Sequence, residues 1–348
     1  MREVTWLTWA QSASPMGLQA YEMQVMAAMR ANPEGWTFRR RAVGSLRSGA
    51  DIDTRIPAKF LDSSGPRLGR AIGRFAGRGL GAVHRFDLRL PPAASAEVVT
   101  VHDLPPLRFD DEGRLPRWSA ESARRARGVL CPSHFAAEEI QELLGVTRVV
   151  VIPNGVGSAY ADATPLAQLE LEALGLPRPF VLHAGGATTR KNLPALASGW
   201  SMAGPSIPDF DLVLVGPTDD RRSRSFAGVK NVRLLGYRDA RMVGQLMASA
   251  ACVIVPSVYE GFGLPALEAM AAGSPVIAAN RAALPEVCGD AAILCEPTAT
   301  GFAEALIGLL SDPYTRGRCK ERGLTRAAQF SWERTAAGHI RAYEELFG

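Results

Sequence analysis

The sequence is poor in lysine, in cysteine pairs and in long apolar runs. Only four of its 348 residues are lysine, so almost every cation is an arginine. No apolar run approaches the ~20 residues that cross a bilayer as a helix, and the first residues carry neither the apolar stretch nor the cleavage site of a signal peptide. The five cysteines are scattered without a CxxC pair, which argues for free thiols and against a disulfide framework or a zinc site. We therefore expect a cytoplasmic protein.

What remains is the composition of a globular enzyme. Apolar residues make up 47% of the chain and charged residues 21%. The length allows two compact domains. Net charge is only +4, and the basic excess lies in residues 1–160, with 21 Lys/Arg against 16 Asp/Glu. We expect no nucleic-acid partner.

Short apolar runs alternate with helical patterns, most regularly in the second half. This alternation is typical of parallel strands covered on both faces, and it predicts an α/β fold with two doubly wound, Rossmann-like domains. We place them at residues 1–155 and 156–330, followed by a final helix over 331–348 that returns to the first domain. In such folds ligands bind beyond the carboxyl ends of the strands, and a cleft between facing domains would hold the substrate. The runs are 4–9, 38–43, 98–102, 129–131, 149–152, 180–184, 212–215, 232–235, 252–255, 276–279 and 292–294.

The first candidate site follows one of these runs in the second half. The segment EGFGLPALE begins at Glu260 and ends at Glu268, and a helix is expected to open at Leu264. Gly261 and Gly263 allow a ligand close to the backbone, and the free amides of a helix start form an anion site. For either acid alone, a structural role in the turn or in a surface ion pair is the better interpretation. Two acids around one glycine turn favour a ligand site.

A second candidate site follows residues 180–184. Arg190 and Lys191 stand between this run and the helix that Asn192 and Pro194 predict. A planar guanidinium and a compact ammonium side by side suit the two phosphates of a diphosphate. An exposed basic loop is the alternative. The scarcity of lysine favours a functional role for Lys191.

The segment EGFGLPALE resembles the E-x7-E signature of retaining GT-B glycosyltransferases, in particular glycosyltransferase family 4. The resemblance continues in LVLVGPTDD, VRLLGYRDARMVGQLMASA and PVIAANRAALPEVCGDAA, and is looser in the first half. It implies a retaining hexosyltransferase that moves a sugar from a nucleoside diphosphate sugar to a glycan, lipid-linked or small-molecule acceptor, in cell-surface polysaccharide or glycoconjugate synthesis. It also implies no cofactor and no metal. GDP-mannose, a UDP-sugar and dTDP-rhamnose remain open as donors.

The resemblance further implies roles for individual residues. Arg190 and Lys191 would stabilise the departing diphosphate, while Glu260 and His102 would contact the donor sugar. Glu268 would bind the ribose. Relatives have a Gly-Gly turn that touches the donor phosphates. Only Gly17 of that turn is present here, because Met16 stands where the family has the other glycine. The other substrate-binding residues implied are Gly186, Tyr237, Arg238, Gly261, Phe262, Gly263 and Leu264.

Other functions remain as alternatives. His102 and Asp103 at the end of a run could be a turn-forming pair, or the base of an inverting GT-B enzyme. A GT-B domain that binds a sugar nucleotide without turnover is a second alternative. A nicotinamide-dependent oxidoreductase would need a GxGxxG after a strand, which neither half has. Asp51-Ile52-Asp53 has the form of a DxD metal motif but lies away from both candidate phosphate sites, so we take it as a chance match.

Residues 51–90 lack the α/β rhythm. Within them Arg67, Arg70, Arg74 and Arg78 recur at steps of three and four, with apolar residues between them. This spacing predicts a basic amphipathic helix. A solvated surface face and a face that contacts the acceptor, or the inner face of a membrane as a peripheral protein, are equally open.

Overall fold

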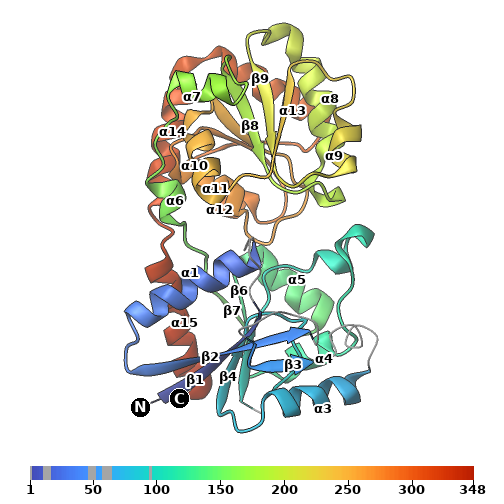
Figure 1. Cartoon of the computed structure of the whole chain (residues 1–348), viewed down its shortest axis with the longest axis vertical. Coiled ribbons are helices and arrows are strands. Elements are labelled where there is room, and N and C mark those ends of the chain that lie inside the picture. The colour runs from blue at the N-terminus through green and yellow to red at the C-terminus, as the bar shows by residue number, and fades with distance from the viewer. Residues whose placement is uncertain (1, 11–16, 46–51, 57–64, 94–95) are drawn as a thin grey trace. The chain divides into compact units, whose positions relative to one another are not determined.

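The computed structural model describes residues 2–10, 17–45, 52–56, 65–93 and 96–348, which form two α/β units (Figure 1). One unit contains the chain up to Gly155 together with Trp332–Gly348, and the other is Val156–Ser331. Each unit is built on one sheet in which every neighbouring pair of strands is parallel. The predicted pair of doubly wound, Rossmann-like halves is therefore confirmed.

The sheet of the first unit has seven strands in the order β3-β2-β1-β4-β5-β6-β7. The strand order reverses at β1, between β2 and β4, which is the topological switch point of this sheet. The strands are β1 (Arg2–Trp9), β2 (Trp36–Ser45), β3 (Thr54–Ile56), β4 (Ala82–Arg85), β5 (Glu97–Thr100), β6 (Gly128–Cys131) and β7 (Val149–Val151).

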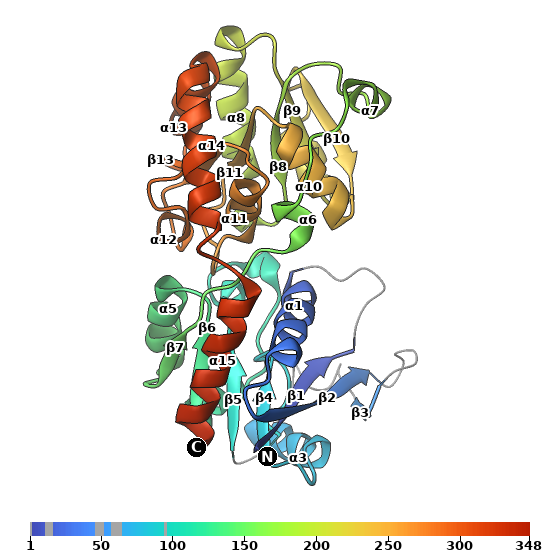
Figure 2. The same ribbon diagram turned by 90° about the vertical axis from the view of Figure 1, so that its left-hand side faces the viewer.

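Helices cover both faces of this sheet. Val98 and Leu130 point to the face that carries α1 (Leu18–Ala31) and α15 (Trp332–Phe347), which lie side by side in Figure 2. Their neighbours Val99 and Val129 point to the opposite face, because side chains alternate along a strand. The remaining helices of the first unit are α3 (Pro66–Ala76), α4 (Ser119–Arg125) and α5 (His134–Leu144), and its short 3-10 turns are η1 (Pro105–Leu107) and η2 (Asp110–Glu112).

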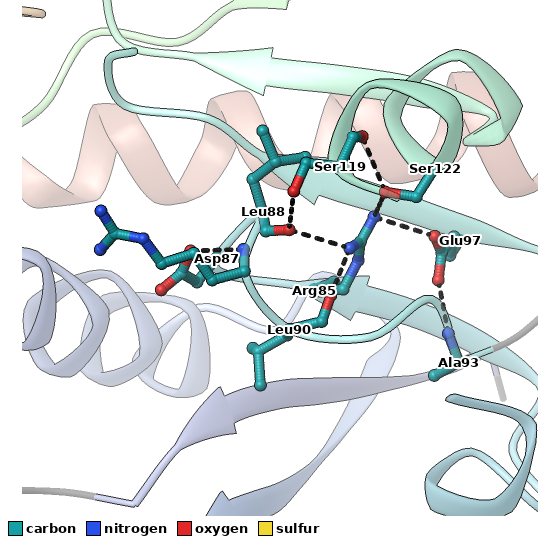
Figure 3. Close-up of polar contacts among 9 residues, drawn as sticks. Arg85, Asp87, Leu88, Leu90, Ala93, Glu97, Ser119 and Ser122 are labelled. Carbon is teal, nitrogen blue, oxygen red and sulfur yellow. Dashed lines mark hydrogen bonds and ion pairs between the residues drawn. The ribbon is translucent and has the colours of Figure 1, made fainter. Parts of the chain in front are cut away.

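The absence of an α/β rhythm in residues 51–90 was a wrong interpretation, since β3, α3 and β4 lie there. Strand β4 has no apolar run, because His84 and Arg85 are both buried in it. Arg85 donates to Glu97 at 3.2 Å and to the Ser122 hydroxyl at 3.0 Å, and the Glu97 carboxylate also accepts the Ala93 amide (Figure 3). A hydropathy pattern cannot indicate a strand whose buried side chains are charged and paired.

The predicted basic helix is α3, and its glycines have a packing role. A Cβ at Gly73 would lie 1.8 Å from the Pro92 carbonyl oxygen, and one at Gly77 would lie 2.0 Å from that of Ala93. One at Gly69 would overlap the Trp118 ring at 2.5 Å. The helix therefore contacts the domain through a glycine face, and its long side chains extend from the opposite side.

The sheet of the second unit has six strands in the order β10-β9-β8-β11-β12-β13. Its order reverses at β8, between β9 and β11, so the carboxyl ends of β8 and β11 mark its switch point. The strands are β8 (Phe180–Ala184), β9 (Asp211–Val215), β10 (Val232–Gly236), β11 (Cys252–Val255), β12 (Val276–Ala279) and β13 (Ile293–Cys295).

Two hydrophobic clusters hold helices on the faces of this second sheet. Leu182 and Val253 belong to the cluster with α10 (Ala240–Ser249) and α11 (Leu264–Ala271), whereas Val181 and Ile254 belong to the cluster with α8 (Leu193–Ala203) and α13 (Ala299–Ser311). The helices and turns are α6 (Ser158–Ala161), α7 (Gln168–Ala173), η3 (Thr189–Lys191), α8 (Leu193–Ala203), η4 (Gly204–Ser206), α9 (Asp220–Ser225), α10 (Ala240–Ser249), α11 (Leu264–Ala271), α12 (Leu284–Cys288), α13 (Ala299–Ser311) and α14 (Pro313–Ala327).

Two expectations from composition can be compared with these elements. All five cysteines are free thiols, and four of them are buried. Among the helices of the described ranges, none is both long and apolar enough to span a bilayer.

Candidate active site

The two candidate sites, EGFGLPALE and the segment with Arg190 and Lys191, meet at the switch point of the second sheet. Strand β8 ends at Ala184 and leads through a loop to η3, which carries Arg190 and Lys191. Strand β11, which pairs with β8, ends at Val255 and leads to Glu260. Two bonds tie these loops together: the Val258 amide donates to the Arg190 carbonyl at 2.9 Å, and the Asn192 side chain donates to the Pro256 carbonyl at 3.2 Å.

Glu260 binds both cations. Lys191 Nζ lies 2.6 Å from one carboxylate oxygen, and Arg190 lies 3.1 Å from the other. Glu260 and Lys191 are 7% and 8% exposed, so the three charges form a nearly buried triad. Burial alone would raise the pKa of Glu260, but Lys191 and Arg190 outweigh it and hold that pKa at about 2. Glu260 is therefore ionised at any physiological pH.

The predicted anion turn lies directly after Glu260. Gly263 is the N-cap of α11 with φ 101°, a conformation that favours glycine, and no side chain caps the helix. Within the first turn Pro265 has no N–H and the Ala266 amide donates to the Gly263 carbonyl at 3.0 Å, so the Leu264 amide is the one that the helix itself does not use. Phe262 is buried and its ring packs edge-on against Phe330 at 5.8 Å, so its side chain belongs to the core. From Gly261, Phe262, Gly263 and Leu264, a ligand would meet mainly backbone.

Glu268 follows one turn later on α11 and faces a residue that the sequence did not indicate. The hydroxyl of Tyr160, on α6, hydrogen-bonds to the Glu268 carboxylate. Burial raises the pKa of Glu268 to about 7, although Tyr160 and Lys191 oppose the shift. Tyr237 lies close enough to influence Tyr160 electrostatically. A tyrosine ~100 residues away in sequence has no motif that could have predicted this contact.

The remaining expected residues of the second unit surround the same strand ends. Gly186, in the loop after β8, has open space where a side chain would stand. Tyr237 and Arg238 follow β10, the third strand from β11 on this side of the sheet, and Tyr237 is 44% exposed. One side of the second sheet, beyond the carboxyl ends of its strands, thus carries Glu260, Glu268, Arg190, Lys191 and these backbone segments.

The first unit carries the other two expected residues. Gly17 is the N-cap of α1, with φ 52°. His102 follows β5, and its Nε2 atom is buried without a hydrogen-bond partner. Burial and the neighbouring His339 lower the pKa of His102 to about 3, so the ring is neutral at physiological pH. A base of so low a pKa is poorly suited to take a proton at neutral pH.

The DxD-like segment has a structural contact in its described residue. The Asp53 carboxylate accepts the Ala42 amide at 2.7 Å, whereas Asp51 lies outside the described residues. Within the described ranges, no group of three or more His, Cys, Asp or Glu side chains could hold a metal ion.

The opposite pKa shifts of the two glutamates predict different effects on stability. Glu268 has a pKa of about 7 against an ordinary 4.5, so its folded form binds a proton more tightly than the unfolded chain. Its contribution to the free energy of unfolding is therefore full below pH 4.5 and is lost as pH rises to about 7. Glu268→Gln should flatten this part of the profile, measured by chemical denaturation at several pH values.

Glu260→Gln is the matched control for that measurement. Because the pKa of Glu260 is lowered to about 2 from 4.5, its stabilising effect is lost only as pH falls below 4.5. Glu260→Gln should hence lower stability by a constant amount between pH 4.5 and 7. Parallel profiles for wild type and Glu268→Gln would contradict the assignment. Other groups that titrate in this window cancel in the comparison.

Comparison with known proteins places this geometry in a family. Residues 178–312 match the family model for glycosyl transferases group 1, and residues 84–159 match that for glycosyltransferase family 4. Among solved structures, sucrose-phosphate synthase from Thermosynechococcus elongatus aligns over 100% of this chain and 99% of its own with a TM-score of 0.80. At 22% identity, that likeness supports the fold alone.

Two curated relatives align over most of the chain. The O-antigen chain mannosyltransferase B of Escherichia coli is 31% identical over 76% of this chain and 74% of its own length. The phosphatidyl-myo-inositol mannosyltransferase of Mycolicibacterium smegmatis is 34% identical over 64% of this chain, which spans 58% of that relative. Together with the two parallel-sheet units, these matches show that the chain belongs to the family 4 glycosyltransferases and has their GT-B fold.

Proposed function

We propose that this glycosyltransferase transfers mannose from GDP-mannose, with retention of configuration, to a saccharide or lipid-linked acceptor. Both curated relatives described above are named as mannosyltransferases. Among the donors that the sequence leaves open, GDP-mannose is the one that carries mannose. The acceptor class follows from the same names, which refer to an O-antigen chain and to a phosphatidylinositol.

The observation that carries the proposal is the triad of Arg190, Lys191 and Glu260 beside the uncapped start of α11. A diphosphate bound to the α11 amides would attract the two cations that Glu260 holds. Charge on the bridging oxygen grows as the glycosidic bond breaks, so both cations stabilise the transition state more than the bound donor. Once released, the Glu260 carboxylate is available for the hydroxyls of the donor sugar.

The low pKa of His102 supports the retaining course. His102 is neutral and weakly basic, which disfavours it as the base of an inverting enzyme. In the retaining course the acceptor attacks from the side on which the phosphate leaves, through an oxocarbenium-like state. The departing phosphate oxygen takes the acceptor proton, and the enzyme supplies position and charge.

A donor panel tests this function directly. We expect GDP-mannose, and neither UDP-glucose nor dTDP-rhamnose, to be consumed with a mannosylated lipid or oligosaccharide acceptor. The product should have the α-configuration by NMR, because α-linked GDP-mannose reacts with retention. Turnover should continue in EDTA, because Arg190 and Lys191 take the place of a metal. A β-linked product, or activity that needs added Mg²⁺ or Mn²⁺, would contradict the mechanism.

Kinetics of the two cations separate transition-state stabilisation from donor binding. Arg190→Ala and Lys191→Ala should each lower kcat by ~10²–10³-fold, the loss seen when an oxyanion donor is removed, with a smaller change in donor KM. The double variant should lose less than the product of the two, since both cations act on one diphosphate. Lys230→Ala, which removes an exposed lysine of the same unit, is the control. An effect on KM alone would mean that the cations only hold the donor.

We also propose that α3 contacts an anionic membrane surface. The side of α3 opposite its glycine face exposes Arg67 and Arg74 next to Leu68 and Phe75, which are 50% and 70% exposed, and Arg78 is exposed in the turn that follows the helix. In the described part of the chain these three arginines have no ion-pair partner, whereas Arg70 pairs with Glu121 at 3.7 Å. Apolar side chains beside unpaired cations are the composition of a helix that lies in a lipid interface.

Vesicle binding tests the role of α3. Replacing Arg67, Arg74 and Arg78 by Gln should weaken binding to phosphatidylglycerol-containing vesicles by ~10²-fold, at about 1 kcal/mol for each basic residue. Phe75→Ser should weaken it further. Arg70→Gln should have a smaller effect, because Glu121, which also pairs with Arg125 at 3.1 Å, offsets part of that charge. Equal binding of all variants in sedimentation assays would assign these arginines to a solvated face.

A further inference from the structure

A chain of buried hydrogen bonds crosses the first unit and twice includes α15. It runs through Trp6 on β1, Tyr343 and His339 on α15, His84 on β4, Thr100 on β5 and Tyr21 on α1, and we call it the α15 network. All six side chains are buried. The glycosyltransferase mechanism above uses none of them.

The carbonyl at the His339 end determines where the protons lie, as the bonds below show. Trp6 donates to the Tyr343 hydroxyl at 3.3 Å, and Tyr343 donates its own proton to His84 Nδ1 at 2.5 Å. His84 then carries its proton on Nε2 and donates to the Thr100 hydroxyl at 2.7 Å. In these three hydrogen bonds the proton donors follow one another from Trp6 to Thr100 without conflict.

The second half of the network continues in the same direction. The Thr100 hydroxyl donates to Tyr21, and this bond lowers the otherwise raised pKa of Tyr21. Tyr21 donates to His339 Nε2 at 3.0 Å, because His339 Nδ1 donates to the Thr335 carbonyl at 2.9 Å. Burial lowers the pKa of His339 to about 4, so the ring stays neutral and Nε2 remains an acceptor. Each of these bonds fixes a tautomer or a hydroxyl rotor.

His102 packs on this network without being part of it. Its ring meets the Tyr21 ring edge-on, with centroids 4.2 Å apart and an interplanar angle of 78°. Tyr21, Thr100, His102 and His339 also line one small internal space. Thr100, which bonds to His84, is the last residue of β5 and lies two residues before His102. The network thus holds both the end of the strand that leads to His102 and the ring that His102 contacts.

We infer that Tyr21 and His339 are positioning residues for His102, so that the C-terminal helix sets the orientation of the histidine that meets the donor sugar. The inference rests on the proposed function, together with the contact between His102 and the donor sugar that the family resemblance implies. Without the bond from Tyr21 to His339, the Tyr21 ring can rotate and His102 loses the surface that restricts it. A displaced contact near the reacting carbon lowers kcat more than it changes donor binding.

Two substitutions on different helices test the inference through one shared bond. Tyr21→Phe keeps the ring against His102 but removes the hydroxyl, and His339→Leu removes the acceptor. Each should lower kcat about ten-fold, below the ~10²-fold of a full misplacement, with donor KM changed less than two-fold. His339→Gln should recover most of the loss, since its side-chain oxygen can accept the Tyr21 hydroxyl. Combining Tyr21→Phe with His339→Leu should add little, because both remove the same bond.

Controls separate this role from a merely structural one. In a His102→Ala background, Tyr21→Phe should have no further effect on kcat. Tyr343→Phe, which removes a buried hydroxyl of the same network far from His102 along the chain of bonds, should lower the melting temperature comparably but kcat less than two-fold. NMR of the His102 ring should show a shifted or broadened signal in Tyr21→Phe and an unchanged one in Tyr343→Phe.

The outcomes are distinguishable. Wild-type protein that transfers no sugar overturns the proposed function and this inference together. Active wild type with unchanged kcat in Tyr21→Phe and His339→Leu overturns the inference alone. The inference also fails if Tyr343→Phe lowers kcat as much as Tyr21→Phe does, since the loss would then follow stability.

Discussion

A carboxylate that holds two cations out of water is the central constraint of the second unit. Glu260 pairs with both Arg190 and Lys191 at the switch point of the sheet, where the loops after β8 and β11 have to meet, and the triad keeps one net positive charge. Removing one member of a buried ion pair leaves an uncompensated charge, which costs about 3–5 kcal/mol. The triad therefore fixes both loops. A second anion that enters the site would be the strongest competitor of Glu260 for these two cations.

The surroundings of the triad match such a ligand. The α11 amides lack a side-chain cap, and Glu268 stands one turn further with a pKa near 7 beside the Tyr160 hydroxyl. Two acids in one site thus have different tasks because their environments differ: one is paired with cations and always ionised, and the other is buried and close to neutrality. The same residue type can serve a charge triad and a hydroxyl-binding position within nine residues of sequence.

The first unit uses the opposite strategy around His102. The six residues of the α15 network form a neutral chain in which every donor meets one acceptor, and burial keeps His102 and His339 uncharged. The buried Arg85–Glu97 pair lies apart from this network, and its Arg85 also binds Ser122 and loop carbonyls. Fully satisfied networks of this kind specify one arrangement of side chains, because any other arrangement leaves a buried group unpaired.

Much of the fold and of the second-unit site could be predicted from the sequence. Continuous apolar runs marked the parallel strands, and the spacing of EGFGLPALE and of Arg190-Lys191 marked the strand ends that carry the site, because these signals are local. Strands β3 and β4 were missed, since β4 buries His84 and Arg85 and has no apolar pattern. The glycines of α3 indicated only low helix propensity until Trp118, Pro92 and Ala93 were found against them.

Tertiary structure alone decided which distant groups meet: Tyr160 with Glu268, Glu260 with both cations, and Tyr21 with His339 and His102. Such contacts depend on how strands and helices pack, and the pairing energy of a buried polar group depends on a partner that its own segment of sequence does not contain.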